Sequence, residues 1–285
     1  MPDLASPLIA WYRENARDLP WRRDGFGAWG TLVSEFMLQQ TPVSRVVPRL
    51  EWLARWPTAD LAAAPPADAV RLWANLGYPA GRLWLHRAAT QIRDRHDGVV
   101  PRDVDALLAL HGIGDYTARA VAVFAYGDRH PVVDTNTRRV LARAVDGRSQ
   151  PGPPAKADLA AMAAILPADD EDAAVVNAAA MELGAIVCTA RAPRCEACPL
   201  AAVCAWRAAG YPTPATTGAS RRATRQRPPG PRSDPEGAAG CRRPPCPCGR
   251  WPPEWPDAAQ RDRAVDSLIA DGLVEVTDGA LHLPR

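Results

Sequence analysis

Residues 107–121 read LLALHGIGDYTARAV, and residues 132–136 read VVDTN. In the first stretch, two apolar helical patterns flank a Gly-Ile-Gly turn. Glycine supplies the backbone angles that such a turn needs and lets main-chain N–H groups approach a partner closely. A helix that opens at this turn points its unpaired N–H groups and its positive dipole end outward, as a phosphate site requires. An ordinary pair of antiparallel helices has the same pattern, so the rest of the chain must decide between the two interpretations.

Helical patterns recur on both sides of this stretch, with Pro, Gly or Asp at the joints. Ser6 is predicted to cap the first helix, with Pro7 in its first turn. Residues 19–22 read as a turn. Residues 25–30 (GFGAWG) match the dinucleotide fingerprint formally, but no strand precedes them, so a loop is predicted. The helical ranges are 6–16, 31–40, 43–56, 68–76, 81–95, 103–110, 115–126, 137–145, 155–165 and 171–187. The chain to about residue 210 is therefore predicted to be all-α and globular.

Composition limits the class of protein. The formal net charge of +2 does not by itself indicate a nucleic-acid-binding protein. No apolar run is long enough to span a membrane and the N-terminus lacks a signal-peptide layout, so we expect a cytoplasmic protein. Lys156 is the only lysine in the sequence. This limits Schiff-base chemistry, which needs an amine.

Four cysteines lie close together, in the segment CTARAPRCEACPLAAVC. Their spacing is C-x6-C-x2-C-x5-C, and in a cytoplasmic chain such a cluster indicates metal or iron–sulfur ligands rather than disulfides. Four thiolates fit tetrahedral zinc or a [4Fe–4S] cube. Zinc sites usually pair two short Cys-Cys knuckles and this segment has one, so the spacing favours iron–sulfur. The predicted ligands are Cys188, Cys195, Cys198 and Cys204.

The C-terminal part of the chain differs sharply in composition. Residues 214–256 hold eight arginines among many prolines, and we expect a disordered linker because so little apolar surface can be buried. A basic tethering arm and a segment with a shifted reading frame are the alternatives for this stretch. Its three cysteines, Cys241, Cys246 and Cys248, are predicted to be adventitious thiols. Residues 257–285 are predicted to form a helix and a hairpin that turns at Asp278-Gly279, resembling part of a winged helix.

Several motifs occur in order and together resemble MutY-type adenine DNA glycosylases of the helix-hairpin-helix superfamily. They are LPWR (19–22), SEFMLQQT (34–41), NLGY (75–78), HGIGDYTA (111–118), VVDTN (132–136), MELGAIVC (181–188) and the cysteine spacing. The resemblance covers residues 1–213 and implies a six-helix module at about 23–128. It also implies a [4Fe–4S] module made by about 1–22 and 129–213. Longer members carry a Nudix-like domain that reads 8-oxoguanine, for which this chain leaves no room.

The resemblance implies that the protein removes adenine mispaired with 8-oxoguanine or guanine. Glu35 lies among apolar residues that would raise its pKa, and it resembles the family's general acid. From the sequence alone, a solvated glutamate is the alternative. Asp134 matches the carboxylate that stabilises the cationic sugar, and it can also cap the helix that follows. Asn136 is expected to orient Asp134 or the sugar. Tyr116 stands where the lysine of endonuclease III lies, so we expect no lyase step.

Base excision also requires the base to leave the helical stack. Side chains that match the family's adenine pocket are Trp21, Arg22, Leu38 and Glu182, although Trp21 and Leu38 could equally be core residues. Side chains that match the residues filling the duplex beside the lesion are Gln39, Gln40 and Tyr78, with Thr41 next to them. Phosphate contacts are expected from Gly112, Gly114 and Thr117.

The predicted partner is double-stranded DNA with A:8-oxoguanine or A:guanine mispairs, bound by a monomer that associates with the nucleoid. Two rival functions remain from the sequence. One is a sister glycosylase for T:G mismatches or oxidised pyrimidines. The other is a non-catalytic binder of damaged DNA, which would need none of Glu35, Tyr116 and Asp134.

Overall fold

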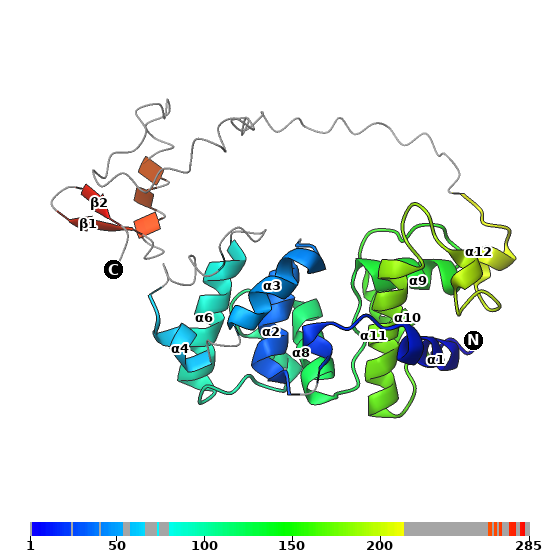
Figure 1. Ribbon diagram of the computed structural model, residues 1–285, viewed down its shortest axis with the longest axis horizontal. Coiled ribbons are helices and arrows are strands. Elements are labelled where there is room, and N and C mark those ends of the chain that lie inside the picture. Colours follow the sequence, from blue (N-terminus) through cyan, green and yellow to red (C-terminus); the bar gives the residue numbers. More distant parts are fainter. Residues whose placement is uncertain are drawn as a thin grey trace. The chain divides into compact units, whose positions relative to one another are not determined.

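The computed structural model describes most of the first 213 residues and short segments near the C-terminus (Figure 1). The described residues are 2–23, 25–39, 41–53, 58–65, 73, 80–213, 262–263, 265–266, 268–269, 274–277 and 280–282. The chain divides into two compact units. Unit 1 is Met1–Ala64 with Trp73–Pro214, and unit 2 is Pro65–Leu72 with Ala215–Arg285.

Unit 1 is built from helices wherever it is described, and the all-α prediction is confirmed for this part of the chain. Its α-helices are α1 (Ala5–Asn15), α2 (Gly27–Leu38), α3 (Val43–Leu53), α4 (Thr58–Ala63), α6 (Ala80–Arg95), α7 (Val104–Leu108), α8 (Asp115–Tyr126), α9 (Thr135–Ala144), α10 (Lys156–Ile165), α11 (Asp170–Ile186) and α12 (Ala205–Ala208). Two short 3-10 helices, η1 (Pro20–Arg22) and η2 (Cys195–Ala197), complete it.

Two local predictions near the N-terminus are wrong. Ser6 does not cap α1, because the Asp3 carboxylate accepts the N–H groups of Ala5 and Ser6 at 3.0 and 3.1 Å. The helix therefore begins one residue before Ser6. The second wrong prediction is the loop 25–30, because α2 begins at Gly27 within it. The predicted turn at 19–22 is confirmed: the Arg22 N–H donates to the Leu19 carbonyl oxygen at 2.9 Å in the 3-10 helix η1. The sequence pattern also misses α4, since six residues are too few to show a helical period.

One large hydrophobic core joins the N-terminal helix to the second half of unit 1. Leu8 of α1 is fully buried against residues of α9, α10 and α11 and against Leu200. Figure 1 shows α1 (dark blue) beside α11 (yellow-green), although they are far apart in the sequence. The division of unit 1 into a six-helix module and an iron–sulfur module stays a prediction.

The helix-hairpin-helix segment consists of α7, a turn and α8. Asp103 caps α7, because its side chain accepts the Ala106 N–H at 2.9 Å. Gly112 has φ +77°, and a Cβ atom there would lie 2.6 Å from the Cβ of Trp84 on α6. Only glycine combines this conformation with so close a contact. Gly114 precedes α8 in an extended conformation, with open space where its Cβ would be.

Unit 2 holds a small antiparallel pair of strands, β1 (Glu275–Thr277) and β2 (Ala280–His282). Thr277 pairs with Ala280, as the predicted hairpin at residues 278–279 requires. The predicted helices at 68–76 and 258–272 are described only in part, and the Arg/Pro-rich stretch 214–256 with its three cysteines lies outside the described residues. No helix in the described part of the chain is long and apolar enough to cross a membrane.

Candidate active site and iron–sulfur segment

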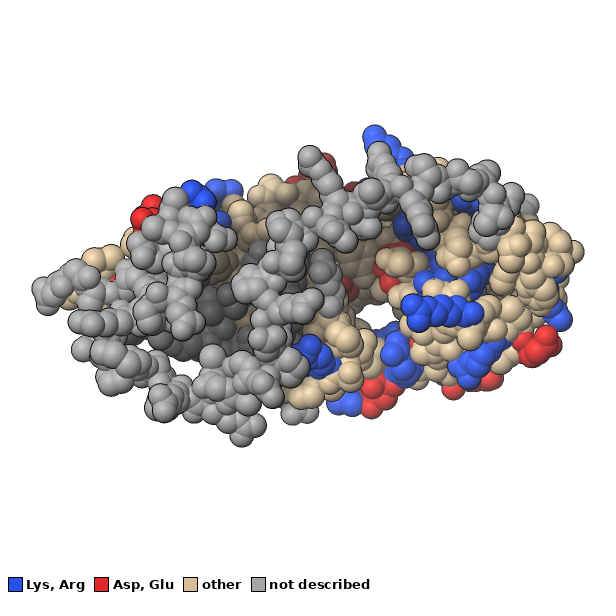
Figure 2. All heavy atoms as spheres, turned by 90° about the horizontal axis from the view of Figure 1, so that it is seen from above, with Lys and Arg blue, Asp and Glu red and all other residues tan. Residues whose placement is uncertain are grey.

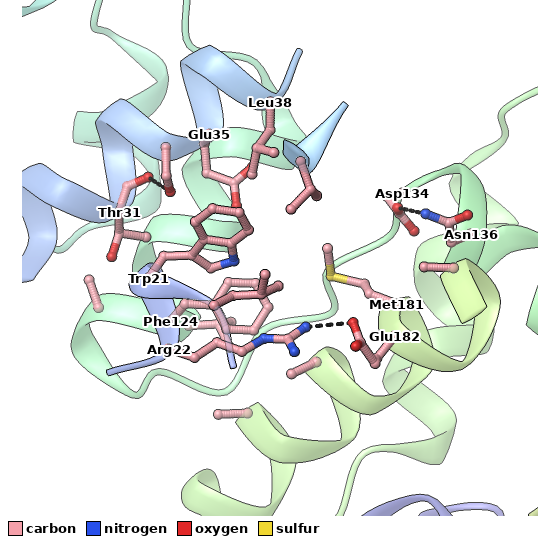
Figure 3. A pocket seen from close by; sticks show the side chains of 18 of the residues that line it. Trp21, Arg22, Thr31, Glu35, Leu38, Phe124, Asp134, Asn136, Met181 and Glu182 are labelled. Carbon is pink, nitrogen blue, oxygen red and sulfur yellow. Dashed lines mark hydrogen bonds and ion pairs between the residues drawn. The ribbon is translucent and has the colours of Figure 1, made fainter. Parts of the chain in front are cut away.

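A cavity of about 1240 Å³ lies in unit 1, lined by residues of η1, α2, α8, α9 and α11. In the view of Figure 3, the Trp21 indole lies between the Glu35 carboxyl group and the Phe124 ring, while Met181 points into the same space. Residues 12–43 and residues 116–185 therefore contribute to one cavity. Its walls combine apolar groups with four carboxyl groups, those of Glu35, Asp134, Glu171 and Glu182.

Glu35 is the buried acid of this cavity. Its helix, α2, is buried on all sides over two turns, since every residue from Thr31 to Met37 is buried. Glu35 itself is 8% exposed. Burial and the nearby Asp134 charge raise the pKa of Glu35 to about 7, against the opposing effect of a hydrogen bond with Tyr116. The Tyr116 hydroxyl is neutral, because burial and the two carboxyl groups raise its pKa well above the ordinary value. Glu35 can thus hold a proton near neutral pH.

Asp134 is held firmly at the start of α9. One carboxylate oxygen accepts the Thr137 N–H at 2.7 Å, which caps the helix as predicted. The other accepts an N–H from the Asn136 side chain at 2.8 Å. The Asn136 side-chain oxygen, Oδ1, in turn accepts from Arg139 at 2.8 Å, and Arg139 also donates to the Gly184 backbone carbonyl oxygen at 2.6 Å. Helix α11 thereby supports the asparagine that orients Asp134.

Glu182 is 1% exposed and is clamped by two arginines. Arg17 donates its backbone N–H and two guanidinium N–H groups to this carboxylate, at 3.1, 2.6 and 2.8 Å. Arg22 adds a fourth hydrogen bond at 2.8 Å. Burial opposes ionisation of Glu182, but these bonds outweigh it and lower its pKa to about 2. All four acceptor positions of the carboxylate are occupied, so Glu182 orients Arg22 rather than offering a vacant acceptor to a ligand.

Most of the predicted site residues come together in this cavity. Those that line it are Trp21, Arg22, Glu35, Leu38, Gln39, Thr41, Tyr116, Asp134, Asn136 and Glu182. Gln40 and Tyr78 lie outside the described residues. Sequence reasoning missed Arg17, Phe124 and Met181, which also line the cavity. Arg17 lies two residues before the LPWR motif, whereas Phe124 and Met181 sit at apolar helical positions that look like core.

The three predicted phosphate contacts lie on the hairpin and not among the lining residues of the cavity. Gly114 is exposed, but the Thr117 side chain is buried, which leaves only its backbone N–H in the first turn of α8 for a ligand. Figure 2 shows several Lys and Arg side chains on the visible face of the right-hand part of unit 1.

The four predicted cysteine ligands follow α11 and are all partly buried and unpaired. Burial and the charges of the other three sulfurs raise the pKa of the Cys198 thiol to about 11, so the four share one small region. Arg143 donates to the Cys188 sulfur at 3.3 Å. No three of the described His, Cys, Asp or Glu side chains are placed to hold a single metal ion. This donor set of four cysteines fits an iron–sulfur cluster.

Comparison with known proteins gives two matching family models. Residues 95–124 match the helix-hairpin-helix motif, and residues 188–204 match the iron–sulfur binding domain of endonuclease III. An adenine DNA glycosylase from Mycolicibacterium smegmatis is 52% identical over 294 residues, covering 97% of this chain and 94% of that protein. The adenine DNA glycosylase of Mycobacterium tuberculosis is 50% identical over 285 residues, covering 97% of this chain and 92% of that protein.

Among solved structures, a thermostable thymine-DNA glycosylase aligns with a TM-score of 0.65 and 25% identity, covering 72% of this chain and 95% of that one. The hairpin, the cysteine segment and the cavity that holds Glu35 and Asp134 define a DNA N-glycosylase of the helix-hairpin-helix, iron–sulfur class. The protein carries a [4Fe–4S] cluster, which the four cysteines of residues 188–204 would hold. Within this class, the chain belongs to the adenine DNA glycosylase family.

Proposed function

We propose that this enzyme hydrolyses the N-glycosidic bond of adenine mispaired with 8-oxoguanine or guanine in double-stranded DNA, and that it has no lyase activity. The observation that carries the proposal is the pair of carboxyl groups in one cavity. Glu35 is buried with a pKa of about 7, while Asp134 is oriented by two hydrogen-bond donors. Two carboxyl groups in different environments suit glycosidic cleavage, in which one acts as acid and the other stabilises a cationic sugar.

Glu35 acts as the general acid. Adenine is a poor leaving group, and protonation at N7 by Glu35 lets it depart with its bonding electrons while the sugar becomes oxocarbenium-like. The ionised Glu35 then accepts a proton from the attacking water. The hydrogen bond with Tyr116 supports this role because it fixes the orientation of the Glu35 carboxyl group.

Asp134 stabilises the developing positive charge on the sugar. Its carboxylate is held by Asn136 and by the Thr137 N–H, so little reorganisation is needed when the charge forms. A transient covalent bond to the sugar carbon is the alternative way in which the same carboxylate could act.

The flipped adenine occupies the apolar part of the cavity, beside Trp21 and Leu38. Arg22 is held by Glu182 and donates to the Arg17 carbonyl oxygen as well, which leaves further guanidinium N–H groups for ring nitrogens of the base. Gln39, Gln40, Thr41 and Tyr78 contact the duplex around the extruded base. The choice of 8-oxoguanine or guanine as opposite base follows from the resemblance to MutY-type enzymes.

The position of the lysine amine supports the absence of a lyase step, since such a step needs an amine at the sugar. Lys156, the single lysine, is exposed at the start of α10 and does not line the cavity. Tyr116 carries a hydroxyl group with a strongly raised pKa, and it cannot form a Schiff base with the sugar. The hairpin N–H groups around Gly112, Gly114 and Thr117 hold the DNA backbone, and the enzyme acts as a monomer.

The test is single-turnover cleavage of a duplex with one A:8-oxoguanine pair, with and without alkali. Strand breaks that appear only after alkali are expected for the wild type. They should disappear in Asp134→Asn and Glu35→Gln and persist in Asp94→Asn, which alters an exposed aspartate of α6 outside the cavity.

A second set of duplexes decides between adenine and the rival bases. An A:guanine duplex should be cleaved, and T:G and thymine-glycol duplexes should not. The structural likeness to a thymine-DNA glycosylase makes T:G the informative control. Cleavage of T:G in preference to A:8-oxoguanine would refute the proposed substrate, and breaks without alkali would refute the absence of lyase chemistry.

A further inference from the structure

The segment that carries Asp134 is held by α11 on both sides of that residue. Residues 127–134 connect α8 to α9 without regular structure, and the N–H groups of Gly127 and Asp128 that bond to α8 lie six or more residues before Asp134. The position of Asp134 therefore depends on contacts with other elements. Arg129 donates to the Leu166 and Pro167 carbonyl oxygens, and Val132 packs against α8. Closest to Asp134 in the sequence, two positions of α11, Asn177 and Gly184, contact the chain at Val132 and Asn136.

Asn177 is completely buried, and its side chain is bonded to this connecting segment. Its carbonyl oxygen accepts the Val132 N–H at 2.7 Å, two residues before Asp134. Its amide group donates to the carbonyl oxygens of His130 at 3.0 Å and Ala173 at 2.9 Å. One side chain thus satisfies both a donor and an acceptor of the segment. Asn177 is not among the residues that line the cavity.

Gly184 provides the second contact, with Asn136, which lies two residues after Asp134. A Cβ atom at this position would lie 2.7 Å from the Asn136 Cβ and 2.7 Å from its carbonyl oxygen. Glycine is therefore required by the close approach of α9 and α11, and not by an unusual backbone angle. The Gly184 carbonyl oxygen also accepts from Arg139, the residue that orients Asn136.

We propose that α11 sets the position of Asp134, with Asn177 fixing the chain before it and Gly184 fixing the chain after it. Asn177 and Gly184 would be positioning residues, since neither lines the cavity. This inference rests on the role proposed above for Asp134. A small displacement of a catalytic group is costly, because a shift of about 1 Å can reduce a rate by on the order of 100-fold.

The proposal is tested with Asn177→Ala and Gly184→Ala in the full-length, cluster-loaded protein. The substitutions act on opposite sides of Asp134 and by different means: one removes hydrogen bonds and the other forces two backbones apart. We expect each to lower the single-turnover rate of adenine release at least about tenfold while changing the Kd for the duplex less than about threefold. Leu8→Ala is the matched control, because Leu8 is fully buried in the same core but lies on α1.

The dependence of the rate on pH separates positioning from a general loss of stability. The charged and titratable groups that act on Glu35 are Asp134 and Tyr116, and the Asp134 charge raises the Glu35 pKa. If Asp134 moves away, the alkaline fall of the rate should shift to lower pH in both variants. It should stay in place in Leu8→Ala, whatever that variant loses in stability. Iron–sulfur absorbance and circular dichroism show whether each variant is folded and loaded at the assay temperature.

The outcomes are distinct. Wild-type rate and an unshifted profile in either folded variant would overturn the inference, as would a rate loss that the Leu8→Ala control reproduces at equal stability. If Asn177→Ala does not fold, Gly184→Ala alone decides. If the wild type itself releases no adenine, the proposed function fails first, and this is seen before any variant is compared.

Discussion

Glu35→Gln replaces the buried acid by a group of nearly the same shape that cannot ionise, and the structure predicts what this does to stability. The pKa of Glu35 is raised from 4.5 to about 7, chiefly by burial. Between these two pH values, the folded protein keeps a proton that the unfolded chain has lost. The wild type therefore loses stability as the pH rises through this window, and the loss is complete above about pH 7.

The size of the loss follows from the raised pKa. A rise from 4.5 to about 7 corresponds to about 3 kcal/mol of unfolding free energy. The side chain is 8% exposed, so solvent screens this effect little. We expect Glu35→Gln and the wild type to be about equally stable near pH 4.5, and the variant to be more stable by about 3 kcal/mol near pH 8.5.

Urea unfolding followed by circular dichroism measures this difference directly at several pH values. Glu14→Gln is the control, because Glu14 is exposed near the end of α1 and should show no such pH dependence. The same Glu35→Gln variant should lose about 100-fold or more of the single-turnover rate, since it has no proton to donate. A variant that is no more stable than the wild type at alkaline pH would refute the assignment of Glu35 as a buried, proton-holding acid.

Three further predictions concern the hairpin, the hydrogen bonds of Glu182 with Arg17 and Arg22, and the iron–sulfur cluster. Gly112→Ala should weaken DNA binding at least about tenfold, because the new Cβ atom clashes with Trp84 and the backbone has a positive φ. Gly114→Ala is the control: its Cβ atom has open space, so this variant should bind nearly as the wild type does. A fluorescence titration with labelled duplex measures both. Glu182→Ala should destabilise the protein by about 2 kcal/mol in urea, because charge-assisted hydrogen bonds to Glu182 are lost while the partly exposed Arg17 and Arg22 can turn to solvent. An effect below about 0.5 kcal/mol would contradict a stabilising role for these hydrogen bonds. Cys198→Ser should lower the iron content and the visible absorbance of the purified protein, and full retention of both would exclude Cys198 as a ligand.

The hydrogen bonds of Glu182 with Arg17 and Arg22 also change the role assigned to the glutamate of the MELGA motif. The resemblance places Glu182 at the adenine pocket, and this residue does line the cavity. Its four hydrogen bonds with Arg17 and Arg22 nevertheless leave it engaged within the protein. Under the proposed function, Arg22 is therefore the polar group offered to the base, and Glu182 would hold its guanidinium in place.

Much of this protein could be predicted from its sequence, because local rules dominate there. Apolar periodicity located most of the helices, and the residue pattern around Gly112 located the hairpin that a family model also matches. The cysteine spacing predicted a [4Fe–4S] cluster, which the matching iron–sulfur domain confirms. These features depend on residues close together in the chain, so the spacing and the residue types can be read from the sequence itself.

Only the tertiary structure decided how distant residues act on one another. Burial of Glu35 on all sides, and its pKa near 7, result from packing of α2 against other elements of unit 1. Arg17 meets Glu182 across 165 positions of sequence, and Asn177 meets Val132 across 45. No local pattern reports such contacts, since desolvation and hydrogen bonding depend on which surfaces are brought together when the chain folds.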